Sequence, residues 1–274
     1  MTFYTSLSGL KNAQVNLDVI AQNIANADTN GFKKSTASFA DIVSASILTD
    51  PSLTVGIGAR VSAIKQNFSL GPVDQTGNAL DVAINGDGFF TVKSPTSGQV
   101  AYTRAGAFGV DGQGFIRNDA GQRMQVFPVN ASGVITSTTT AGDAQVPLTN
   151  TATPAADYTG MSVGGDGKLT ASYADGSTSV IGYVALASFP ANNGLKQIGN
   201  ATWTATGLSG SATLGQPGTG AFGGLQSGSI ERSNVDLATE MVGLIAAQRS
   251  FQANAKAIDT TTQISQTIIN LRTS

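Results

Sequence analysis

The chain has 274 residues and a mass of 27.8 kDa, and only 12% of its residues are charged, about half the usual fraction. It contains neither cysteine nor histidine, which excludes disulfides, thiolate nucleophiles, Cys/His zinc sites and imidazole bases. A net charge of −2 and a pI of about 5.0 argue against a nucleic-acid-binding protein. Because 41% of the residues are hydrophobic, the chain can build at least one core.

The N-terminal segment carries apolar residues at the spacing of a helical heptad. Six of seven positions, which follow one another at steps of four and three, are apolar. This spacing predicts an amphipathic helix that ends near Asn30 and Gly31. The seven positions are Phe3, Leu7, Leu10, Gln14, Leu17, Ala21 and Ile24.

The C-terminal segment repeats this pattern over a longer stretch. Six of its seven heptad positions are apolar. Beyond residue 258 the apolar positions shift gradually around the helix, as 3.6 residues per turn requires. The pattern predicts a helix over residues 235–272. Ser233 and Asp236 resemble a capping box at its start. The stripe consists of Leu237, Met241, Leu244, Gln248, Phe251, Ala255 and Ile258, followed by Ile264, Ile268 and Leu271.

Two interpretations of these stripes remain open. Each helix can cover its own core as an ordinary amphipathic helix. Alternatively, the two stripes pair with each other and with other subunits, because they match in phase. Only Lys11 and Asp18 are charged between residues 3 and 24, which favours contact with protein over contact with water. Gln14 and Gln248, at the fourth position of each stripe, either set the helix register or lie at its edge.

Between the helices the sequence predicts an antiparallel β-domain, so the expected fold class is α+β. The turn Asn85-Gly86-Asp87-Gly88 predicts a hairpin between residues 81–84 and 89–93. Residues 37–47 predict a short helix, and the Thr/Ala-rich residues 135–160 predict a long loop. Further strands are predicted over residues 102–104, 115–117, 124–127, 168–173, 179–189 and 202–205.

No motif predicts catalysis, and we expect no catalytic, cofactor-binding or metal-binding residue and no cofactor. Gly218, Gly220 and Gly223 match a dinucleotide-binding pattern but lack its strand-to-helix context. Most aspartates lie beside glycines, where their side chains bond the turn backbone. No apolar run is long enough to span a membrane, and residues 1–11 do not resemble a secretory signal.

Several motifs resemble those of the bacterial flagellar rod and hook protein family. Residues 23–33 (NIANADTNGFK) are similar to the family's N-terminal signature, and residues 3–10 resemble the start of hook proteins in particular. The similarity covers roughly residues 1–127 and 163–274. Other matching segments are residues 75–90, 102–108, 225–228, 233–237 and 252–256.

The resemblance implies a structural subunit of the flagellar hook, outside the cell after export, and not an enzyme. Many copies would self-assemble into a flexible hollow tube, a universal joint that carries motor torque from rod to filament. The implied architecture is a helical coiled-coil inner core (residues 1–30 and 233–274), a connecting segment (31–70) and an outer antiparallel β-domain (71–232). Implied partners are the distal rod protein, the hook cap protein, the hook–filament junction protein and the flagellar type III export apparatus, without nucleic acid or membrane insertion.

The resemblance also assigns roles to individual residues. The expected subunit-packing residues are Leu7, Leu10, Leu17, Ile24, Leu237, Met241, Leu244, Phe251, Ile258, Ile264, Ile268 and Leu271. The expected hinge or turn residues are Asn30, Gly31, Gly56 and Gly58.

The chain departs from many hook proteins in one respect. They insert a second outer β-domain where this sequence has only residues 134–160. We therefore expect a short hook subunit. A distal rod subunit, which forms a rigid drive shaft, is the alternative because distal rod proteins also lack that domain. A phage-tail or adhesin-like fibre subunit is a more remote alternative.

Overall fold

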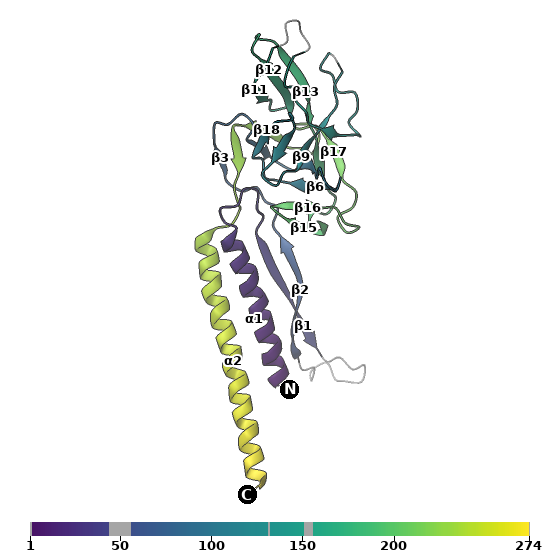
Figure 1. Cartoon of the computed structure of the whole chain (residues 1–274). Helices are drawn as coiled ribbons and strands as arrows, with labels where there is room; N and C mark the ends of the chain where they lie inside the picture. Colours follow the sequence, from purple (N-terminus) through teal and green to yellow (C-terminus); the bar gives the residue numbers. More distant parts are fainter. Residues whose placement is uncertain (1, 44–55, 131, 151–155, 274) are drawn as a thin grey trace. The chain divides into compact units, whose positions relative to one another are not determined.

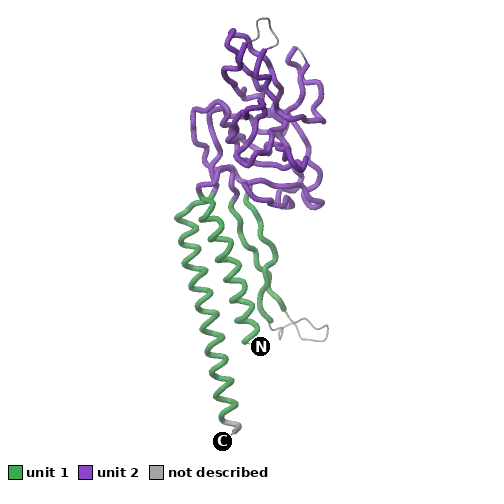
Figure 2. Tube along the Cα trace, viewed as in Figure 1, with its two compact units in different colours: residues 1–27, 34–67, 235–274 green, residues 28–33, 68–234 purple. Residues whose placement is uncertain are grey.

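A computed structural model describes residues 2–43, 56–130, 132–150 and 156–273 of the chain. The described residues form two compact units (Figure 2). Unit 1 falls within residues 1–27, 34–67 and 235–274, and unit 2 within residues 28–33 and 68–234. Each unit is therefore built from segments that are far apart in the sequence.

Unit 1 consists of two helices and one β-hairpin. Helix α1 (Thr2–Ala25) packs along helix α2 (Leu237–Thr273) and also against the hairpin of β1 (Ser35–Val43) and β2 (Gly56–Gln66) (Figure 1). None of the helices that the described residues form has both the length and the apolar composition needed to cross a lipid bilayer. The two helices match the two predicted amphipathic segments.

The two helices run antiparallel. As the residue number rises along α1, the number of its neighbour on α2 falls. The contacting pairs are Gly9 with Asn254, Ile20 with Gly243, and Asn23 with Glu240.

Helix α2 is capped by Asp236 rather than by Ser233. The Thr239 N–H donates a hydrogen bond to Asp236 Oδ1 at 2.8 Å, the contact that an N-cap side chain makes with the third helical residue. This bond holds the pKa of the Asp236 carboxyl below its ordinary value. The predicted capping box, with Ser233 at the cap, is wrong because the helix begins only at Leu237.

The helix predicted over residues 37–47 is also wrong. Strand β1 pairs antiparallel with β2, from Ser35 opposite Gln66 to Val43 opposite Gly56. The backbone groups of β1 therefore bond a partner that lies far along the chain, and this pairing overrides the local helical preference. Residues 44–47 of the predicted helix lie outside the described residues.

Unit 2 is a β-domain whose described strands all pair antiparallel. One 13-stranded sheet dominates it, with two small sheets, β4 with β18 and β3 with β19 (Figure 1). A single 3₁₀ turn, Asn192–Gly194, is assigned in the described part of unit 2. The strands are β3 (Val73–Gln75), β4 (Val82–Asn85), β5 (Phe89–Lys93), β6 (Val100–Thr103), β7 (Phe108–Val110), β8 (Ile116–Asn118), β9 (Arg123–Phe127), β10 (Gly142–Asp143), β11 (Tyr158–Val163), β12 (Lys168–Tyr173), β13 (Thr178–Val184), β14 (Leu186–Ser188), β15 (Lys196–Gly199), β16 (Thr202–Thr204), β17 (Thr213–Gly215), β18 (Gly224–Ser227) and β19 (Ser229–Glu231). With two helices elsewhere in the chain, the α+β class is confirmed.

Two buried clusters hold unit 2 together. The larger cluster lies on the inner face of the main sheet and includes Phe90, Met124 and Leu169. The smaller is aromatic and centres on Trp203 and Phe89, whose rings meet edge to face with centroids 5.8 Å apart. Alternate residues of β5 supply both clusters, as the period of a strand requires.

The hairpin predicted around residues 85–88 is wrong, although both of its strands exist. Strand β4 pairs with β18, whereas β5 pairs with β6, β9 and β14. Gly86 and Gly88 both have φ of +127°, outside the left-handed helical values that a two-residue hairpin turn needs. The chain therefore passes here from one sheet to another.

Two other predicted segments are subdivided. The predicted strand 179–189 breaks at Ala185 into β13 and β14, where the chain leaves β9 and joins β5. The predicted loop 135–160 contains β10, and it places Ala144 and Val146 in the larger core cluster. The described part of this loop is therefore anchored to the sheet.

We predict that Gly106→Ala destabilises unit 2 strongly. A Cβ at this position would overlap the backbone carbonyl of Val82, which is held in a strand. We expect the free energy of unfolding to fall by about 2 kcal/mol, measured by urea denaturation.

Gly109→Ala is the matched control for this prediction. Nothing lies within 4 Å of its Cβ position, and its backbone is not left-handed. We expect a change of less than about 1 kcal/mol. Equal losses for the two variants would contradict the packing that we describe at Gly106.

Candidate functional site

The seam between α1 and α2 combines small residues with the buried side chain of Ile20. Ala13 on α1 and Ala247 on α2 are buried, and Gly9 and Gly243 allow the opposite helix to approach closely. This seam is offset from the apolar stripes that the sequence predicts to pack. The helices therefore contact each other inside the chain while much of each stripe stays accessible.

The predicted subunit-packing residues fall into three groups. Leu237, Met241, Ile264 and Ile268 are exposed. For Leu271 the structure describes only the helical backbone. Their role in packing subunits stays a prediction. The half-buried members are Leu7, Leu10, Leu17, Ile24, Leu244, Phe251 and Ile258.

Gln14 and Gln248 are both exposed. Neither amide lies in the seam between α1 and α2 within the chain. Their placement agrees with the edge interpretation as far as one chain is concerned.

A buried amide, Asn23, ties the three elements of unit 1 together. Its Nδ2 donates to the Ser35 carbonyl at 2.8 Å and to Glu240 Oε2 at 3.0 Å. Its Oδ1 accepts from the Ser35 N–H at 2.9 Å. Lys34 forms an ion pair with the other Glu240 oxygen at 2.5 Å. One side chain thus links α1, β1 and α2. Its amide nitrogen donates two hydrogen bonds and its amide oxygen accepts one.

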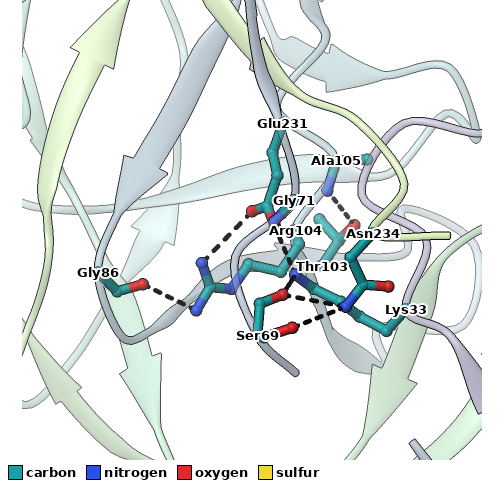
Figure 3. Close-up of polar contacts among 9 residues, drawn as sticks. All are labelled: Lys33, Ser69, Gly71, Gly86, Thr103, Arg104, Ala105, Glu231 and Asn234. Carbon is teal, nitrogen blue, oxygen red and sulfur yellow. Dashed lines mark hydrogen bonds and ion pairs between the residues drawn. The ribbon is translucent and has the colours of Figure 1, made fainter. Parts of the chain in front are cut away.

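A second cluster, centred on the Glu231 carboxylate, lies inside unit 2 (Figure 3). Lys33 forms an ion pair with Oε1 of Glu231, and both side chains are fully buried. Arg104 approaches Oε2 at 3.4 Å. The Gly71 N–H donates to Oε1 at 3.0 Å. We call Lys33, Arg104 and Glu231 the charge triad.

Backbone carbonyls bind both cations of the triad, although Arg104 Nε has no hydrogen-bond partner among the described residues. Lys33 Nζ also donates to the Ser69 carbonyl at 2.7 Å, and Arg104 Nη2 donates to the Gly86 carbonyl at 3.0 Å (Figure 3). The Arg104 guanidinium lies over the Phe89 ring, 5.3 Å from its centroid. Five segments, around residues 33, 70, 86, 104 and 231, therefore meet in one cluster, in which Lys33, Gly71 and Arg104 contact the carboxylate directly.

Burial dominates the electrostatics of the triad. It lowers the pKa of Lys33 because the charged form loses hydration, although Glu231 acts in the opposite direction. Burial also lowers the pKa of Arg104, again against the attraction of Glu231. The two buried cations therefore share the Glu231 carboxylate, and Asp87 adds a second attraction for Arg104.

The predicted hinge or turn residues have defined positions in the structure. Gly31 is buried in unit 2 with φ of +69°, and its N–H donates to the Glu231 carbonyl at 2.8 Å. A Cβ on Gly31 would overlap the backbone of Ala105. Neighbouring Asn30 is half-buried. Gly31 therefore makes a left-handed turn in close contact with another segment, and its role as a hinge stays a prediction.

The other two glycines belong to the hairpin of unit 1. Gly56 begins β2, and Gly58, with φ of +137°, lies opposite Ile42 next to a β-bulge. A Cβ on Gly58 would overlap the Ser8 side chain of α1. Its lack of a side chain therefore lets the hairpin approach the helix.

Sequence reasoning did not single out Asn23 or the charge triad as structural centres. Asn23 and Lys33 begin and end the N-terminal signature, and Arg104 lies in another matching segment. Lys33 and Glu231 each stand next to a second charged residue, Lys34 and Arg232, so isolation among uncharged neighbours does not mark the triad in the sequence. No pattern in the sequence says which charges pair.

The polar clusters of both units make structural contacts. The buried charged groups are directed at one another and at backbone, and no group of three or more acidic residues among the described ones is arranged to hold a metal ion. Helices from both ends of the chain enclose the sequence of a β-domain, and they expose apolar side chains.

Comparisons with known proteins agree with a structural role. Residues 3–33 match the family model described as flagella basal body rod protein, and residues 83–171 match the flagellar hook protein FlgE/F/G D1 domain. Residues 226–271 match the flagellar basal body rod FlgEFG protein C-terminal.

Similar relatives include both rod and hook proteins. The flagellar basal-body rod protein FlgG of Bacillus subtilis is 36% identical, over 99% of this chain and 98% of the relative. FlgG of Caulobacter vibrioides is 32% identical over 98% of both chains. The flagellar hook protein FlgE of Escherichia coli is 28% identical over 99% of this chain and 100% of the relative.

The chain therefore belongs to the flagellar rod and hook protein family. It is a structural motility protein and a component of the bacterial flagellum, not an enzyme.

We predict that Glu231→Gln costs about 3–5 kcal/mol of unfolding free energy. The variant keeps the side-chain volume but removes the anion that Lys33 and Arg104 share, and only Arg104 keeps a second attraction, to Asp87. Urea denaturation followed by Trp203 fluorescence measures the loss, because that residue is fully buried in unit 2.

Asp74→Asn is the control for the loss of one carboxylate charge. Its ion pair with Arg232 is exposed on both sides, so we expect a change below about 1 kcal/mol. A Glu231→Gln variant as stable as this control would show that the triad does not stabilise unit 2.

We also predict that Lys33 makes stability rise with pH below its ordinary pKa of 10.5. Its pKa is lowered in the folded state, so between the two values the unfolded state binds more protons, and raising the pH then favours folding. Burial raises the pKa of Tyr102, which has the opposite effect at high pH.

The test is therefore the difference between the wild type and Lys33→Met, from pH 7 upward. We expect the wild type to gain unfolding free energy relative to the variant as pH rises. A difference that does not vary with pH would refute the lowered pKa.

Proposed function

We propose that the chain is a hook subunit that assembles in many copies into a hollow, flexible tube carrying torque from rod to filament. One observation carries the assembly role: α2 continues beyond the end of α1 (Figure 1). Because Gly9 faces Asn254, the first residue of α1 comes level with about residue 261 of α2. Residues 262–273, about 18 Å of helix, have no counterpart on α1.

This overhang is apolar on one side. Ile264 and Ile268, one helical turn apart, are 61% and 60% exposed. Two further apolar residues, Leu237 and Met241, are exposed at the other end of α2. Copies that pack along this helix would bury these side chains at about 25 cal/mol per Å². We infer a coiled-coil core of terminal helices, completed only between copies.

The proposed domain roles follow the same division. Residues 1–30 and 233–274 would form the inner core, residues 31–70 the connecting segment and residues 71–232 the outer domain. Asn30, Gly31, Gly56 and Gly58 would serve as hinges or turns at the connecting segment. The proposed partners are the distal rod protein, the hook cap protein, the hook–filament junction protein and the type III export apparatus.

Residues 3–10 and 77–81, which resemble hook proteins, support the hook over the rod. A specific observation favours the second candidate, a distal rod subunit. The rod proteins named FlgG align with this chain over 98% of their own length. The alignment with the E. coli hook protein spans 410 positions against 274 residues here.

Electron micrographs of the purified assembly distinguish the two candidates. A curved or bendable tube supports the hook, and a straight rigid tube supports the rod.

We predict that Ile264→Lys abolishes tube formation without unfolding the single chain. The residue is exposed, so the isolated chain loses little, whereas an apolar contact between copies would have to bury a charge. Circular dichroism checks the fold, and electron microscopy checks the tubes.

Gln266→Lys, on the other side of the same helical turn, adds the same charge to an exposed polar residue and should still assemble. Tubes formed by Ile264→Lys as readily as by Gln266→Lys would refute the role of the overhang.

A further inference from the structure

The chain contains three Asn-Gly pairs, at residues 30–31, 85–86 and 193–194. An Asn-Gly pair can rearrange chemically, because glycine has no side chain to keep its backbone nitrogen away from the asparagine amide. The reaction requires a glycine N–H that is not engaged elsewhere and an asparagine side chain that can rotate. The structure shows which of the three pairs meets both conditions.

Two of the pairs are held by a hydrogen bond from the glycine N–H. The Gly31 N–H donates to the Glu231 carbonyl at 2.8 Å, and Gly31 is buried. The Gly194 N–H donates to the Ala191 carbonyl at 3.0 Å in the 3₁₀ turn, and the Gly194 carbonyl accepts from Thr206 Oγ1 at 2.6 Å. Each of these two nitrogens must lose a hydrogen bond before it can react, which slows the reaction.

The third pair, Asn85 and Gly86, is not held in this way. Asn85 is the last residue of β4, Gly86 follows it, and both residues are exposed. Neither the Asn85 side-chain amide nor the Gly86 N–H makes a hydrogen bond within the part of the chain that the structure describes. Both conditions for the reaction are therefore met at residues 85–86.

The passage from β4 to β5 requires the glycine of this pair. Gly86 has φ of +127°, a conformation that residues with a side chain rarely adopt. A Cβ at this position would also lie 2.9 Å from Gly223 Cα. The tight backbone path therefore places beside Asn85 the one residue type that leaves its amide most reactive.

We propose that Asn85 is a modification site, at which the folded chain deamidates through a cyclic succinimide. The Gly86 nitrogen loses its proton and bonds to Cγ of Asn85, and the side-chain nitrogen leaves with that proton as ammonia. Water, the only co-reactant, then opens the ring at one of its two carbonyl carbons. Opening at the former side-chain carbon gives aspartate, and opening at the backbone carbon gives isoaspartate. The oxidation state of every atom stays the same.

The two products should affect unit 2 differently. Aspartate leaves the backbone unchanged and adds one negative charge at an exposed position. Isoaspartate routes the backbone through the former side chain and lengthens it by one methylene group. The added length comes directly before Gly86, whose carbonyl accepts from Arg104 Nη2 at 3.0 Å beside the charge triad. We therefore expect isoaspartate to weaken this contact and to lower the stability of unit 2.

Incubation of the folded wild-type chain in mildly alkaline buffer tests the site. Protein isoaspartyl methyltransferase with radiolabelled S-adenosylmethionine marks isoaspartate. Peptide mass mapping locates it and distinguishes deamidation, which changes the mass, from isomerisation of an aspartate, which does not. We expect about tenfold more product at residues 85–86 than at either other pair, because no hydrogen bond must be broken there. In concentrated urea, where the native hydrogen bonds are lost, the three pairs should react at similar rates.

Two variants of the exposed residue 85 measure the consequence. Asn85→Gln keeps an amide but would need a larger ring, so it should resist the reaction. Freshly prepared Asn85→Asp carries the charge of one product on an unchanged backbone, so it should unfold at nearly the urea concentration of the fresh wild type. After incubation the wild type should unfold at a lower urea concentration than before, whereas Asn85→Gln should not change.

Equal product at the three pairs of the folded chain, or none at residues 85–86, would overturn the proposal. Equal losses of stability in the incubated wild type and Asn85→Gln would overturn the effect that we assign to isoaspartate. The measurements use single chains, so they are independent of whether the chain assembles as a hook or as a rod.

Discussion

The carboxylate of Glu231 is the constraint on which unit 2 depends. It neutralises Lys33, approaches Arg104 and accepts a backbone hydrogen from Gly71, all out of contact with water. Separating these groups would leave buried charges without partners, which costs far more than any exposed ion pair contributes. The short segment 28–33, far from the rest of unit 2 in the sequence, is held in that unit by this anion and by the Gly31 N–H.

Unit 1 is held together by a similar polar cluster that contains fewer buried charges. Asn23 joins α1, β1 and α2 through hydrogen bonds to the Ser35 backbone and to the Glu240 carboxylate, which also forms an ion pair with Lys34. Small residues let the helices approach, but they bury little apolar area, and the larger side chains of α2 stay exposed. A helix that is incomplete alone and completed by further copies is suited to a subunit of the rod and hook family, whose members are components of the flagellum.

The low charge of the chain acquires a physical meaning from this arrangement. Several of its few charged groups are used internally, in the triad and around Glu240, so the described surface relies largely on Ser, Thr, Asn and Gln. Such a surface has fewer like charges to repel a neighbouring copy.

Local periodicity determined the two helices, the α+β class and strands such as 89–93 and 168–173, because each depends on residues a few positions apart. The family motifs could likewise be recognised in the sequence, including the segment that contains Asn23 and Lys33. Only the tertiary structure decided that β4 pairs with β18 rather than with β5, and that residues 35–43 form a strand against residues 56–66. Only the tertiary structure shows that Lys33, Arg104 and Glu231 contact one another. The reason is that pairing partners and buried charges depend on contacts between distant segments, which no local pattern encodes.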